Sequence, residues 1–101
     1  MPTKSRTFVV RGKVFLYPGM AGWHFFPVDK MTSAKIKKGQ EGKKRNGWGS
    51  IPVTVTLRKS TWKTSIFPDK DGTYLLPLKS DIRKKEEILD GDILTVRLRL
   101  S

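Results

Sequence analysis

The feature that most constrains the fold is an internal repeat, in which segments of the first half match segments of the second half fifty residues later. Residues 16–18 match residues 66–68 around a shared proline. Residues 25–28 match residues 75–78 in the same ungapped register, again around a proline. Self-similarity at a fixed period predicts a fold built from two related units.

Farther along, the offset changes to 41, because residues 53–58 match residues 94–99. The first half therefore carries nine extra residues, which fall within the glycine-rich basic segment 37–49. Glycines and like charges in one run are typical of an exposed loop. The two predicted halves are about residues 7–58 and 59–101.

Each half is expected to read strand, turn, strand, short helix, loop, strand. Apolar residues alternate with Thr and Arg in residues 51–58 and again in 94–100, which predicts two half-buried strands. The turn-forming residues 69–72 separate two β-prone runs, so residues 63–77 are predicted to form a hairpin.

Two short helices are expected among the strands. In the second half, Ser80 is a candidate N-cap for a helix of about two turns that ends at Glu87. In the first half, Asp29 or Thr32 is the candidate cap of a helix that ends near Lys38. The fold class expected from the sequence is thus mainly β with two short helices.

Composition sets further bounds. A chain of 101 residues with 37% hydrophobic residues is expected to form one domain, residues 1–101, around one core. It has no cysteine, no apolar run long enough to span a membrane and no secretory signal pattern, which favours a cytoplasmic location. The formal net charge of +12 would attract polyanions.

The second half contains a pattern found in transcription factors. Residues 74–85 give a strand, a proline and a short helix with an Arg, and residues 88–94 give Gly-Asp followed by a strand. This order resembles the AbrB and MazE families, in which one such unit from each of two chains interlocks into a double-split β-barrel. The resemblance implies the same barrel from two tandem halves of one chain, and hence a monomer.

A second resemblance covers nearly the whole chain. It is carried by residues 22–27, residues 62–68, Gly72, Tyr74, Pro77, Arg83, Gly91 and Asp92. These positions resemble the bacterial family called domain of unknown function 1905, whose members occur alone or joined to a bacteriocin-protection segment. The resemblance implies a bacterial origin and a double-split barrel, and it implies no particular activity.

The basic segment is the first candidate site. Its residues are Lys35, Lys37, Lys38, Lys43, Lys44, Arg45 and Trp48. The cations could neutralise phosphates and the indole could stack on a base. The alternative is a solvated loop that keeps the protein soluble, since net charge serves solubility as readily as binding.

The predicted central hairpin supplies the second candidate site. Its residues are Trp62, Ser65, Phe67, Tyr74, Lys79 and Arg83. An aromatic side chain beside an Arg and a Ser could line a recess for a small ligand or a protein partner. The alternative is that the aromatic residues belong to the core and that Arg83 extends from a helix into solvent.

Enzymatic activity is not expected from this sequence. His24 is the only histidine and no cysteine is present, so no metal-binding set or catalytic triad is visible, and no cofactor motif is found. The first hypothesis is a basic binding protein that engages nucleic acid or another polyanion with little sequence preference. The alternative is a small-ligand or protein-partner module that uses the central hairpin.

Overall fold

The computed structural model describes residues 7–17, 22–39, 49–69 and 71–100, and this part of the chain forms strands and two short helices. The strands are β1 (Thr7–Lys13), β2 (Phe15–Leu16), β3 (His24–Val28), β4 (Ile51–Leu57), β5 (Ser60–Pro68), β6 (Tyr74–Leu78) and β7 (Ile93–Leu100). The helices are α1 (Lys30–Gly39) and α2 (Ser80–Glu86). The prediction of a mainly β fold with two short helices is confirmed.

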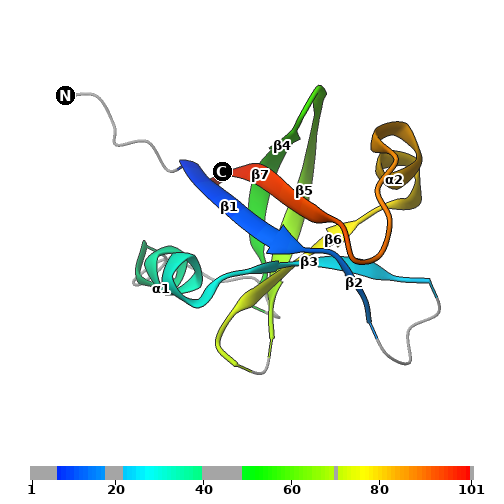
Figure 1. The fold of residues 1–101 in the computed structure, drawn as a ribbon. Coiled ribbons are helices and arrows are strands. Elements are labelled where there is room, and N and C mark those ends of the chain that lie inside the picture. The colour runs from blue at the N-terminus through cyan, green and yellow to red at the C-terminus, as the bar shows by residue number, and fades with distance from the viewer. Residues whose placement is uncertain (1–6, 18–21, 40–48, 70, 101) are drawn as a thin grey trace.

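The strands form one antiparallel sheet that curves into a nearly closed barrel, with α1 and α2 at opposite sides (Figure 1). The strand order is β1-β7-β4-β5-β6-β3-β2, and the two end strands are consecutive in the chain, separated by Val14 alone. Near the break, a Cβ added at Gly12 would lie 2.9 Å from the Pro27 carbonyl oxygen. The absence of a side chain at Gly12 thus lets β1 lie directly against β3.

The core fills the inside of the barrel. In β4 the residues Ile51, Val53, Val55 and Leu57 are buried, and in β7 the residues Leu94, Val96, Leu98 and Leu100 are buried. The residues between them are half-buried or exposed, so both predicted alternating strands are confirmed. The largest fully buried side chains are Phe26, Ile36, Leu57, Ile66, Leu76, Leu98, Val10, Val14, Val28, Val53, Val55 and Val96. Because these residues come from both halves, the chain forms one shared core.

The strand registers relate the two halves. In the β3–β6 ladder Phe26 lies opposite Leu76, which is its match at the offset of fifty, and the flanking pairs are symmetric about this one. In the β4–β7 ladder Thr56 lies opposite Arg97, its match at the offset of 41. The order strand, strand, helix, strand also occurs twice along the chain. The description as a double-split barrel of tandem halves stays a prediction.

The hairpin predicted for residues 63–77 of the second half is present as β5 and β6. Its ladder pairs Phe67 with Leu75. In the turn, the Asp69 amide donates to the Thr73 carbonyl at 2.8 Å, and Gly72 adopts a φ of 78°. Glycine carries little strain in this left-handed conformation, which explains its place in the turn.

Helix α1 begins directly after β3 and is capped by Asp29, one of the two predicted caps. The Asp29 carboxylate accepts a hydrogen bond from the Thr32 amide at 3.0 Å. Although burial acts to raise the pKa of Asp29, hydrogen bonds from Thr32 and neighbouring amides outweigh it and lower the pKa below its ordinary 3.8. The helix continues to Gly39, so residues 37–39 of the predicted basic loop are helical.

Ser33 attaches α1 to the sheet. Its side chain is fully buried, and the hydroxyl donates to the Val28 carbonyl at 3.2 Å and accepts from the Tyr74 amide at 3.1 Å. Val28 and Tyr74 are paired residues of β3 and β6. One hydroxyl therefore joins the helix to two neighbouring strands, and the buried Ile36 packs one turn farther along.

Helix α2 follows β6 and has the predicted length of about two turns. Its N-cap is Lys79, with extended backbone, and no side chain caps the helix. The predicted cap, Ser80, is instead the first helical residue, because the extended backbone of β6 continues through Lys79. The helix ends at Glu87, which adopts a left-handed φ of 55°.

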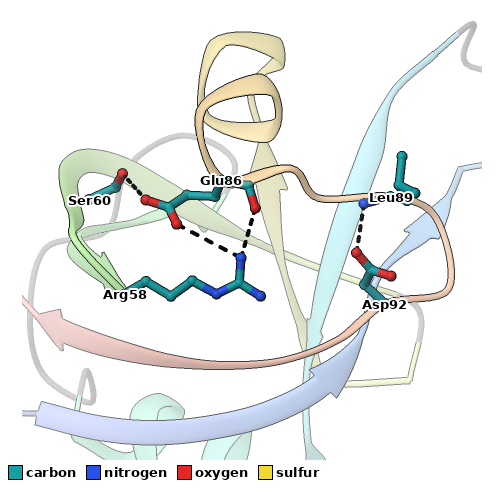
Figure 2. A network of polar contacts seen from close by, with 5 residues as sticks. All are labelled: Arg58, Ser60, Glu86, Leu89 and Asp92. Carbon is teal, nitrogen blue, oxygen red and sulfur yellow. Dashed lines mark hydrogen bonds and ion pairs between the residues drawn. The ribbon is translucent and has the colours of Figure 1, made fainter.

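Polar contacts tie the end of α2 to the β4–β5 hairpin (Figure 2). Arg58 Nη1 donates to the Glu86 carbonyl at 2.7 Å, and the Glu86 carboxylate accepts from the Ser60 hydroxyl at 2.5 Å and lies 3.8 Å from Arg58 Nη1. In the next turn, the Leu89 amide donates to Asp92 at 2.9 Å. The position of α2 is thus fixed from its last turn.

Candidate functional site

The outer face of four neighbouring strands carries cations. Because side chains alternate across a strand, the residues between the buried positions of β1, β7, β4 and β5 point outward. The cations at outward positions are Arg11, Lys13, Lys63, Arg97 and Arg99, and all five are exposed. We call this surface the basic sheet face.

Strand pairing places these five cations in adjoining rows. Arg11 lies opposite Thr95, and Thr54 lies between Arg99 on one side and Lys63 on the other. Neighbouring strands are about 4.8 Å apart and alternate residues along a strand are about 6.8 Å apart. Charges so spaced cover an extended area rather than converging on one point.

No negative charge interrupts this surface from within its own strands. None of β1, β4, β5 and β7 contains Asp or Glu. Among the residues that the structure describes, the one ion pair joins Arg58 to Glu86, so the five cations of the basic sheet face are left without an acidic partner there. The neutral residues paired with Arg97 and Arg99 are threonines and the exposed Val9.

The described residues of the predicted basic site lie on α1 and not on these strands. Lys35, Lys37 and Lys38 are exposed on α1. The Lys37 ammonium reaches toward the β5–β6 turn, lying 3.7 Å from where a Gly72 Cβ would be. The remaining predicted residues of this site, Lys43, Lys44, Arg45 and Trp48, lie outside the described residues.

A groove lies where β3 begins, beside the end of β6 and the start of α2. Its volume is about 340 Å³, and it is lined by Gly22, Trp23, Pro77, Leu78, Lys79, Ser80 and Arg83. We call it the α2 groove. Two of its residues, Lys79 and Arg83, are cations, and none is acidic.

Trp23 is held on one side of the α2 groove by an aromatic cluster. Its ring stacks on Phe25 with the ring centres 5.8 Å apart and the planes 24° from parallel. Phe25 also contacts the rings of Phe15 and Tyr17. Trp23 nevertheless remains 51% exposed, so much of the indole is open to a ligand.

The corner before β3 sets the direction of Trp23. Gly22 has a φ of 73°, which favours glycine. His24 Nδ1 lies 2.8 Å from the Gly22 carbonyl and donates to it, because a carbonyl can only accept. His24 is half-buried at the start of its strand.

The opposite side of the α2 groove is built from the first turn of α2. Arg83 Nε donates to the Leu78 carbonyl at 3.2 Å, which fixes the root of the guanidinium and leaves its two terminal nitrogens for other partners. Lys79 and Ser80 are exposed at the same end of the helix. Because Glu86 anchors the last turn of α2, this arrangement is held from both ends.

The fold separates the residues that were predicted to line a recess at the central hairpin. Lys79 and Arg83 line the α2 groove, whereas Trp62, Ser65, Phe67 and Tyr74 are not among its lining residues. Trp62 lies opposite Val55 and packs against the core, and its indole Nε1 is buried without an acceptor among the described residues. Tyr74 is 5% exposed. Ser65 is half-buried and Phe67 is exposed on β5.

Sequence reasoning missed Trp23 in the groove and the cations of the basic sheet face. A signal existed for Trp23, because antiparallel pairing of the two repeated segments continues the β3–β6 register to place Trp23 opposite Lys79. A signal also existed for Arg97 and Arg99, which fill the outward positions of an alternating strand. Their grouping with Arg11 and Lys63 follows from the strand order, which sequence periodicity does not contain.

The fold and these surfaces define a small basic β-barrel protein with an exposed cationic face and one aromatic, cationic groove. The chain belongs to the family described as Domain of unknown function (DUF1905), whose model matches residues 11–98. A comparison with curated proteins finds no match. Neither α1 nor α2 of the described residues combines the length and apolar character needed to cross a membrane.

Proposed function

We propose that the protein binds nucleic acid through the basic sheet face, by contacts to the phosphate backbone. The observation that carries the proposal is the grouping of five exposed cations from β1, β5 and β7 on a surface of four adjacent strands that contain no Asp or Glu. Uncompensated positive charge raises the local concentration of polyanions and supplies binding energy through counterion release.

An extended polymer fits this surface better than a compact anion. The cations come from three strands, β1, β5 and β7, with β4 lying between β5 and β7, so a single small anion would reach few of them. A nucleic acid repeats its charge along its length and can contact several rows together. If all five cations contact phosphates, the logarithm of the duplex binding constant should fall with the logarithm of salt concentration with a slope of about −4.5.

The side chains beside these cations favour binding with little sequence preference. The residues paired with Arg97 and Arg99 are threonines and Val9, so no aromatic side chain lies directly opposite these two cations. Threonine hydroxyls can donate to phosphate oxygens, but such contacts carry no direct sequence information. The proposed interaction is therefore with the backbone rather than with the bases.

The experiment is a fluorescence anisotropy titration of labelled duplex and single-stranded oligonucleotides at about 50 mM and about 200 mM salt. The double variant Arg97→Ala/Arg99→Ala is compared with Lys84→Ala/Lys85→Ala on α2. Each double variant takes the formal net charge from +12 to +10 by removing two cations. We expect the first to weaken binding strongly and to make the salt slope shallower by about two, and the second to do neither.

Equal losses in the two double variants would contradict the assignment to this face, because only total charge would then matter. No binding at low salt, or binding indifferent to salt, would contradict the function itself. The predicted basic segment stays a separate proposal for the same function. A third variant, Lys43→Ala/Lys44→Ala, tests whether that segment contributes. The cytoplasmic location and the monomeric state also stay predictions.

A further inference from the structure

The α2 groove contains an exposed aromatic surface, the indole of Trp23, on which a planar group can stack. Trp23 rests on Phe25, and about half of its surface stays exposed although it belongs to a cluster of four aromatic rings. An indole held in place by neighbouring rings loses little conformational freedom when a planar group stacks on it. Bases stack on such aromatic side chains irrespective of sequence.

The same groove offers two cations for an anion. Lys79 and Arg83 form no ion pair among the described residues, and no lining residue is acidic. The nearby carboxylate of Asp81 is engaged by the Ile82 amide at 2.9 Å. Arg83 is half-buried and fixed through Nε, so its terminal nitrogens are preorganised to bind an anion.

The opposite end of the β3–β6 ladder shows that Arg83 is not required by the backbone. There, Ser33 Oγ donates to the Val28 carbonyl, and both residues lie fifty positions before Arg83 and Leu78. A small hydroxyl thus provides the same carbonyl contact and seats its helix on the sheet. At the α2 end, a long cation makes this contact beside an open groove.

The required ligand must satisfy the indole and the cations together. An inorganic anion would leave the Trp23 face unused, and a neutral aromatic ring would leave Lys79 and Arg83 unpaired. The volume of about 340 Å³ falls within the range of small-molecule sites. A planar ring joined to an anionic group meets both demands, and a nucleotide has this chemistry.

We propose that the α2 groove binds a nucleotide unit, with its base stacked on Trp23 and its phosphate held by Lys79 and Arg83. The unit comes either from a free nucleotide or from a single-stranded nucleic acid. The site is independent of the basic sheet face, because no lining residue of the groove belongs to that face. It adds a site specific for a base and phosphate to a proposed function that depends on phosphate alone.

The test is an isothermal titration of the full chain with adenosine monophosphate, adenosine and inorganic phosphate, with the Trp23 indole signal followed by nuclear magnetic resonance. We expect adenosine monophosphate to bind at least about tenfold more tightly than either fragment. Trp23→Ala should weaken its binding about tenfold or more. Arg83→Ser, which keeps a donor for the Leu78 carbonyl, should weaken adenosine monophosphate binding and leave adenosine binding unchanged.

Two controls keep this test independent of folding and of the first proposal. Lys85→Ala, on the same helix but outside the groove, should leave adenosine monophosphate affinity within about twofold. Trp23→Phe should retain most of the affinity if stacking is the cause. Arg97→Ala/Arg99→Ala should leave adenosine monophosphate binding unchanged, and Trp23→Ala should leave salt-dependent duplex binding unchanged.

Competition identifies the source of the nucleotide unit. The competitor is a short single-stranded oligonucleotide, added to the Arg97→Ala/Arg99→Ala variant with adenosine monophosphate bound. Displacement of adenosine monophosphate would show that the groove binds a nucleotide unit of a nucleic acid. No displacement would show that the groove binds a free nucleotide. Equal affinity for phosphate and adenosine monophosphate would overturn the proposal in favour of a simple anion site. Equal affinity for adenosine and adenosine monophosphate would overturn it too, because stacking would then be the whole interaction. Failure of all three compounds to bind would also overturn the proposal.

Discussion

The two ends of the β3–β6 ladder are built on the same backbone geometry and carry opposite surfaces. At the α1 end, Ser33 bonds to the Val28 carbonyl at 3.2 Å, and at the α2 end, Arg83 bonds to the Leu78 carbonyl at the same distance. The first end is closed, because Ser33 is fully buried. The second borders the α2 groove.

The two ends differ in the side chain that makes this contact, a serine in α1 and an arginine in α2, and in how deeply each helix is buried. Serine lets α1 place two residues, Ser33 and Ile36, in the buried interior. No residue of α2 is fully buried; the half-buried Ile82 packs against the core, and polar contacts of Glu86 hold the last turn. A ligand-sized space borders the start of this helix.

The largest expected effect comes from exchanging the two side chains. Ser33→Arg places a cation at a fully buried position without an acidic partner, and we expect it to reduce the free energy of unfolding by at least about 3 kcal/mol. Arg83→Ser should change it by less than about 1 kcal/mol, because the carbonyl keeps a donor. Urea denaturation measures both variants.

If Ser33→Arg does not fold, Ser33→Ala provides the measurement. Loss of the hydroxyl removes its bonds to Val28 and Tyr74, and the expected destabilisation is about 1–3 kcal/mol. Equal stabilities of Ser33→Arg and Arg83→Ser would contradict the contrast between a closed and an open end.

The second prediction concerns the tether of α2. Glu86→Ala removes the acceptor of the Ser60 hydroxyl, which is 3% exposed, and we expect destabilisation of about 1–3 kcal/mol. Thermal and urea unfolding measure the change. Glu87→Ala is the matched control, because this exposed neighbour keeps the same left-handed backbone strain and should shift stability by less than about 0.5 kcal/mol. A similar loss of stability in both variants would show that the Glu86 contacts are not the cause.

The smallest expected effect is the pH dependence of the α1 cap. The hydrogen-bonded Asp29 has a folded-state pKa below its ordinary 3.8, so between the two values the unfolded chain binds more protons. The cap's stabilisation is therefore present above the ordinary pKa and is lost as the pH falls through the lowered one. Asp29→Ala should cost about 1 kcal/mol at neutral pH.

Asp29→Asn isolates the charge, because asparagine also caps helices. The difference in unfolding free energy between the original protein and this variant should move in favour of the variant as the pH falls from about 6 to about 3. Urea denaturation at each pH measures it. A difference that stays constant with pH would show that the carboxylate charge adds nothing to the cap.

Local signals in the sequence predicted much of the fold. Alternation of apolar and polar residues located β4 and β7, the turn chemistry of residues 69–72 located the β5–β6 hairpin, and Asp29 was one of two expected caps. These features depend on neighbours in the chain, so a local pattern is sufficient. Ser80 was wrong as a cap because the helix begins one residue earlier than the pattern showed, with Lys79 as its N-cap.

The candidate sites were harder to predict, because they join residues from distant segments. The sequence indicated an aromatic residue, an Arg and a Ser around a recess, but it took Trp62, which packs on the core, in place of Trp23. It located positive charge in the segment 37–49, whereas the charges on the described sheet come from strands at both ends of the chain.

The sequence by itself determined the strands, the helices, the repeated order of elements and the strong positive charge, since each is set by residue type and short-range spacing. Only the tertiary structure decided which outward side chains of different strands share one surface. It also decided which end of the β3–β6 ladder stays open. Strand order brings Arg11 beside β7 and Trp23 beside Lys79. That order is selected by burial of the shared core, a property of the whole chain that no local pattern records.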